Sequence, residues 1–227
     1  MLQYNMAKVT FISDIEKDME NIWNKCNKKP KFGNFKINPS LEKICIGKKF
    51  EEAKPELEKY LKATYDSPYI ETFRKVMQEL WDKIEVQFFD RMNSLMKKEY
   101  KKEIKSYITT LNICPYNPLE PSFIVSLFYP LQRAILTCGH EIMHLYFHEF
   151  YWNEVEKRIG PKKTGDLKEA LTILLNLEFI DLWLTRDGGY NEHKELREFI
   201  SKTWKEEKDI EKLLEKCIIF LNNSTES

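Results

Sequence analysis

The sequence has few cysteines and no excess charge of either sign. Its five cysteines are an odd number and include no CxxC pair. That pattern argues against a disulfide framework or a thiolate zinc ribbon and favours a reducing compartment. Lys plus Arg and Asp plus Glu each total 36, so the formal net charge is zero. Because no overall field attracts polyanions or anionic lipid, we expect neither nucleic acid nor a membrane as partner.

Long apolar runs are also missing. The longest, near Phe123–Tyr129 and Leu171–Leu177, are far shorter than the roughly 20 residues that cross a bilayer. The N-terminus shows no basic region followed by a long apolar stretch, so we expect no signal peptide. Together with the cysteine usage, these absences predict a cytoplasmic protein that does not insert into membranes.

Histidine is scarce too, with 4 in 227 residues, yet two of them form the motif His140-Glu141-x-x-His144. Histidines four apart on a helix are separated by roughly 40° around the axis and about 6 Å along it, so both imidazoles reach one metal ion. The glutamate then faces a metal-bound water, from which it takes a proton. A random chain of this composition shows the pattern on the order of one per cent of the time.

The surroundings of the motif strengthen this interpretation. From Leu131 to Trp152 the ordinary charges are Arg133, Glu141 and Glu149, so the helix is apolar nearly all round and is expected to be buried. Burying two imidazoles and a carboxylate costs on the order of several kcal/mol unless a partner such as a metal ion binds them. The alternative is a core helix whose histidines bond backbone carbonyls.

The motif resembles that of the HExxH zinc metallopeptidases. Their extended pattern has Val or Thr three residues before the first His and a hydrophobic residue two after the second, places filled here by Thr137 and Tyr146. The resemblance implies a Zn²⁺ cofactor and a peptide or protein substrate. Phe147 and Phe150 stand where the metzincin motif HExxHxxGxxH has Gly and its third His, which excludes that branch.

The third ligand is expected from a second helix. Thermolysin-like enzymes, the gluzincins, use a Glu twenty or more residues downstream, and Lys168-Glu169-Ala170-Leu171-Thr172 resembles their pattern. Glu169 is therefore the preferred ligand, although Asp166-x-x-Glu169 also fits a capping box at a helix start. Glu178, on the opposite side of the same helix, is the rival. The family's Asp that orients the first His corresponds to Ile173, so another acceptor must hold that imidazole.

Tyr190 and His193 follow the second helix in the segment Gly-Gly-Tyr-Asn-Glu-His. Thermolysin-like enzymes steady the oxyanion of the reaction with a Tyr or His, so the resemblance makes both residues catalytic candidates by chain position. The alternative is an ordinary surface loop.

Periodicity and turn residues predict a predominantly helical α+β protein. Helices are expected near Asp14–Cys26, within a loop-rich segment containing Pro30, Gly33 and Pro39, and then over the ranges 51–64, 69–100, 166–185, 195–201 and 209–222. Gly160–Gly165 is expected to be a loop. The domains are predicted as a helical part, 1–105, and a catalytic part, 106–227, packed as one compact unit.

Strand-like patterns precede the helix that carries His140 and His144, the predicted metal helix. Ser106–Ile113 and Ser122–Phe128 are rich in β-branched residues and flank a segment with three prolines, which predicts a small antiparallel sheet beside that helix. The resemblance implies a zincin-like core, in which an edge strand receives substrate backbone. A structural hairpin is the alternative.

The sequence therefore predicts a zinc metallopeptidase in which His140, His144 and Glu169 hold Zn²⁺ and Glu141 acts as general base. The alternative is a non-catalytic or regulatory interaction protein with a structural or degenerate metal site, because the Asp of the family's pattern is missing. A hydrolase acting on another bond also fits, since fold and metal do not fix substrate. The oligomeric state is not indicated.

Overall fold

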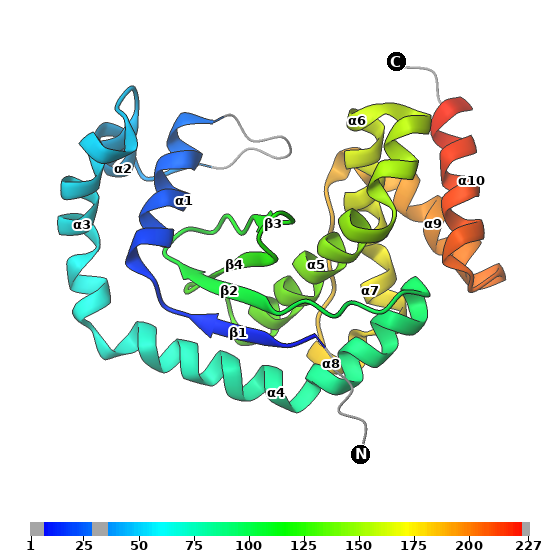
Figure 1. Cartoon of the computed structure of the whole chain (residues 1–227), viewed down its shortest axis with the longest axis horizontal. Coiled ribbons are helices and arrows are strands. Elements are labelled where there is room, and N and C mark those ends of the chain that lie inside the picture. Colours follow the sequence, from blue (N-terminus) through cyan, green and yellow to red (C-terminus); the bar gives the residue numbers. More distant parts are fainter. Residues whose placement is uncertain (1–6, 29–35, 224–227) are drawn as a thin grey trace.

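The computed structural model describes residues 7–28 and 36–223, and they are predominantly helical around a small sheet (Figure 1). Two predicted features lie outside these ranges: the loop at Pro30 and Gly33, and most of the N-terminus, where no signal peptide was expected. The first helices are α1 (Ile15–Asn27), α2 (Pro39–Cys45), α3 (Phe50–Asp66), α4 (Pro68–Met96) and α5 (Leu131–Phe150). The later ones are α6 (Trp152–Leu171), α7 (Ile173–Glu178), α8 (Ile180–Trp183), the 3₁₀ turn η1 (Asn191–His193), α9 (Lys194–Glu206) and α10 (Ile210–Asn223). None of the described helices is both long enough and apolar enough to cross a membrane.

The sheet has the order β1-β2-β4-β3, with strands β1 (Val9–Ile12), β2 (Ile104–Thr109), β3 (Tyr116–Asn117) and β4 (Ser122–Ser126). β1 and β4 both run parallel to β2, and β3 pairs antiparallel with β4. The predicted antiparallel pairing of β2 with β4 is therefore wrong. The proline-containing segment reverses the chain twice. The first reversal leads into the extra strand β3, and the second follows β3, where Asn117 Oδ1 accepts from Leu119 N at 3.0 Å. Two reversals return β4 to the direction of β2.

The outer edge of β1 is satisfied by side chains of the long helix α4. Glu85 Oε1 accepts from the backbone N–H of Val9 at 2.8 Å, and Gln78 Oε1 accepts from that of Phe11 at 3.0 Å. Gln78 Nε2 also donates to the Val9 carbonyl at 3.1 Å. Because these bonds occupy the edge groups of β1, that edge is closed to pairing with another strand.

Helices α1, α2 and α3 form a satellite core at one end of the sheet (Figure 1). Asp18 of α1 ties it to β2, since its carboxylate accepts from the Thr109 hydroxyl at 2.6 Å and from the Thr110 backbone N–H at 3.0 Å. These bonds compensate for burial of Asp18, which is 1% exposed. The apolar residues of this core are Met19, Ile22, Leu41, Cys45, Ala53, Leu57, Leu61 and Leu111.

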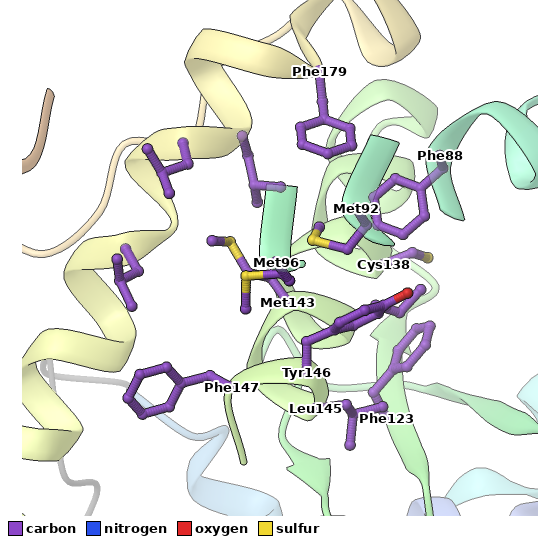
Figure 2. Close-up of a cluster of buried hydrophobic side chains, with 14 of the residues drawn as sticks. Phe88, Met92, Met96, Phe123, Cys138, Met143, Leu145, Tyr146, Phe147 and Phe179 are labelled. Atoms are coloured by element: carbon purple, nitrogen blue, oxygen red, sulfur yellow. The ribbon is translucent and has the colours of Figure 1, made fainter. Parts of the chain in front are cut away.

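Helix α5 runs through the main core, as its composition predicted. Its buried side chains meet α4 on one side, where Met143 lies near Met92 and Met96, and the sheet on another, where Leu145 lies near Phe123 (Figure 2). Such a helix is fixed by packing on several sides, so the side chains it presents have little freedom to move.

The segment after α5 departs from prediction in two places. The predicted Gly160–Gly165 loop is a kink at Gly160 alone, where φ is 75°, and the helix resumes at Pro161. Proline at the first position of a helix loses no bond, which explains this restart. The single helix predicted over 166–185 is divided into the end of α6, α7 and α8. Residue 169 therefore belongs to α6.

Candidate metal centre

Helices α5 and α6 bring His140, His144 and Glu169 together. Glu169 Oε2 lies 3.6 Å from His140 Nε2 and 3.3 Å from His144 Nε2, and the two imidazole centroids are 4.4 Å apart. Zinc takes ligands at about 2.0–2.2 Å in a tetrahedron, so ligand atoms on one ion lie roughly 3.3–3.6 Å apart. The two distances from Glu169 to the imidazole nitrogens match this spacing, and the three ligand atoms all lie within 4.8 Å of one another, so the cluster could hold a metal ion.

The electrostatics of the two histidines differ. His144, with a side chain 2% exposed, is kept neutral because burial and the positive charges of Lys168 and His140 lower its pKa to about 3. For His140, burial favours the neutral ring, but the carboxylates of Asp187, Glu169 and Glu141 prevail and raise its pKa to about 10. The two rings therefore differ in charge: His140 is held protonated by the carboxylates around it, while His144 stays neutral.

Glu169 is held inside α6 with its carboxylate facing the histidines. Although burial opposes its ionisation, His144, His140 and Lys168 hold the pKa of Glu169 well below its usual range. The capping-box alternative is wrong, because the helix resumes at Pro161 and Glu169 lies in its last turn, not at its start.

The rival carboxylate lies elsewhere. Glu178 Oε1 accepts from Trp204 Nε1 at 2.8 Å and pairs with Lys208 Nζ at 2.8 Å. Its contacts are therefore with α9 and the chain beyond it. Among the described residues, the groups close enough to share one ion are His140, His144 and Glu169.

Asp187 lies at the second nitrogen of His140, where an acceptor was expected. Its Oδ1 lies 3.5 Å from His140 Nδ1, while Oδ2 accepts from the Thr172 hydroxyl at 2.6 Å and from Arg197 at 3.1 Å. Although burial opposes ionisation, His140, Thr172 and Arg197 hold the pKa of Asp187 below its usual range. A carboxylate on the far nitrogen of a ligating His fixes the ring's tautomer and orientation. The sequence hid this residue, because Arg186-Asp-Gly-Gly indicates a helix end.

Lys168 and Tyr116 lie beside the cluster, and neither was predicted from the sequence as a site residue. Lys168 Nζ lies 2.5 Å from Glu169 Oε1 and 4.6 Å from the centre of the Tyr116 ring. That ring, on β3, is 5.1 Å from the His144 ring. His148 is also beside Tyr116 but stacks on Trp152 at 4.1 Å, so it contributes to packing.

Glu141 is buried next to His140, with 6% of its surface exposed. Burial raises its pKa to about 7, against the lowering influence of His140 and Lys168. A carboxylate whose pKa is close to neutrality both takes up and releases a proton readily, which is the property of a general base and acid.

Tyr190 and His193 lie side by side, with ring centroids 5.8 Å apart. Burial and the carboxylates of Glu169, Glu141 and Asp187 raise the pKa of Tyr190, which keeps its hydroxyl protonated as a hydrogen-bond donor. His193 is buried, and its Nε2 is 3.2 Å from Asp166 Oδ1.

No protein-family model, curated protein or solved structure matches this chain.

Proposed function

We propose that this protein is a zinc-dependent metallopeptidase with a zincin-like core, acting in the cytoplasm. The observation that supports it best is the spacing of His140, His144 and Glu169, whose facing atoms are 3.3 and 3.6 Å apart with Glu141 adjacent. Five free cysteines among the described residues agree with a reducing compartment.

In this proposal each residue of the centre has a separate role. His140, His144 and Glu169 hold Zn²⁺, which, when bound, lowers the pKa of a water molecule and polarises the scissile carbonyl. Glu141 accepts a proton from the attacking water and passes it to the leaving amine. Asp187 orients His140, and Tyr190 donates its hydroxyl to the developing oxyanion.

The test compares Glu141→Gln with the parent in metal analysis and in a peptide-library digest. Glutamine has the shape of glutamate but does not accept the proton, so we expect one zinc per chain in both proteins and hydrolysis reduced roughly 10²–10⁴-fold in the variant. Glu149→Gln is the matched control, because Glu149 lies on the same helix and pairs with Lys102 at the surface. Equal cleavage by E141Q and the parent would contradict the proposal.

The burial of the centre favours one second function, a regulatory interaction protein with a structural metal. The His144 and Glu169 side chains are 2% and 9% exposed, and structural zinc sites are closed. X-ray absorption on the zinc-loaded protein separates the two: three protein ligands with a water favour the peptidase, and four protein ligands favour the structural site.

A further inference from the structure

Lys168 is a buried cation beside the proposed zinc ligands. It is 7% exposed, and burying an ammonium group is unfavourable unless other groups compensate its charge. Two groups do so here: Glu169 Oε1 at 2.5 Å and the face of Tyr116, with Nζ 4.6 Å from the ring centre. The ammonium is therefore fixed between β3 and α6.

This arrangement makes the two oxygens of Glu169 unequal. Oε2 faces His140 and His144, at 3.6 and 3.3 Å from their Nε2 atoms, whereas Oε1 is taken by Lys168. Carboxylates bind metals through either one oxygen or two. With Oε1 bonded to an ammonium, one oxygen is left to face an ion at the histidines.

We propose that Lys168 is a positioning residue that makes Glu169 a one-oxygen zinc ligand and thereby preserves a coordination position for water. The inference rests on the proposed function, because it requires a metal at the cluster. Its chemical consequence is that Lys168 withdraws negative charge from the ligand, which keeps the bound ion a stronger Lewis acid.

The charge of Lys168 should also weaken binding of the metal ion. An ammonium bonded to a ligand oxygen repels a divalent ion a few ångströms away, and this repulsion is strong in a buried site. Replacing Lys168 with an uncharged residue should free Oε1, raise the coordination number of the metal and tighten its binding. A lysine with a merely structural role would show the reverse, since its loss would loosen the site and weaken binding.

The experiment uses the full chain loaded with Zn²⁺ or Co²⁺. Zinc X-ray absorption and the visible spectrum of Co²⁺, whose bands weaken as coordination rises above four, report the ligand sphere, and competition with a chelator gives the affinity. The parent is compared with Lys168→Met, which keeps length and apolar volume without charge, and with Lys168→Arg, which keeps the charge. Lys162→Met, an exposed lysine of the same helix, is the matched control.

We expect a four-coordinate ion in the parent, with two imidazoles, one carboxylate oxygen and water. K168M should show a higher coordination number and an affinity raised on the order of tenfold or more, with slower peptide hydrolysis. K168R and K162M should resemble the parent. The parent spectrum tests the inference without any variant, because two Glu169 oxygens on its metal would overturn it.

The outcomes separate this inference from the proposed function. If the parent binds no metal, or His144→Ala binds as tightly as the parent, the metal centre itself is wrong and the role of Lys168 is rejected with it. If the parent binds through the cluster but K168M has the same spectrum and affinity, the role of Lys168 alone is rejected.

Discussion

At the scale of single residues, the centre depends on how each imidazole is oriented. His140 is held between two carboxylates, with Glu169 at its Nε2 and Asp187 at its Nδ1, 3.6 and 3.5 Å away. Asp187 is in turn fixed by Arg197 and Thr172. Because these contacts lie at both ring nitrogens, His140 is presented to an ion in one orientation, and little order remains to be gained on binding.

Asp187→Asn should weaken zinc binding roughly 10–100-fold, the usual effect of losing a carboxylate behind a ligating His. Asparagine keeps the size of the side chain but removes the charge that supports His140 and Arg197. Chelator competition measures the affinity, and circular dichroism checks the fold. Asp181→Asn is the control, since Asp181 pairs with Arg91 away from the cluster. An affinity of D187N within about twofold of the parent would reject this role.

At the scale of elements, α5 is positioned by close packing at the residue before His140. A Cβ on Gly139 would lie 2.9 and 3.0 Å from atoms of Trp183 and 3.3 Å from Phe88. The glycine therefore allows α4 and α8 to approach α5 closely, as small residues do at helix contacts. The position of the metal helix depends on this approach.

Gly139→Val should destabilise the protein by roughly 1–3 kcal/mol, because added methyl groups must displace Trp183 and Phe88 in a packed core. Urea unfolding measures the change. A Trp183→Leu substitution in the same background should recover part of the loss by making room, which a simple effect on helix propensity would not allow. Gly188→Ala, where a Cβ meets nothing within 4 Å, serves as control. Equal stability of G139V and parent would show that the contact is not restrictive.

At the scale of the whole molecule, the sheet and the main core join the two predicted parts of the chain. The predicted boundary between 105 and 106 falls within β2, which pairs with β1 from one part and β4 from the other. The main core likewise extends from Val9 on β1 to Leu221 on α10. A metal held by α5 and α6 would add a link between two of the helices in this core.

Zinc should therefore raise the melting temperature of the whole protein. A ligand that binds the native state alone stabilises it by about 2.7 kcal/mol at a free concentration of 100 times its Kd. Calorimetry with added Zn²⁺, and again after chelation, measures the shift and its reversal. Glu169→Gln and His144→Ala should lose most of the shift, while His148→Ala should keep it. An equal shift in all of these proteins would mean that zinc acts elsewhere.

The sequence by itself determined features that lie within a single helix. The apolar character of α5 and the spacing of His140 and His144 follow from the helical repeat, which is local, and the gluzincin resemblance singled out Glu169. Only the tertiary structure decided the parallel direction of β2 and β4 and the placement of Asp187, Lys168 and Tyr116 around the cluster. These depend on contacts between elements distant in sequence, such as β3 with α5, and no local pattern encodes them. Asp187 shows the reason most clearly, because a turn-like Asp-Gly-Gly gives no indication of which buried imidazole it will meet.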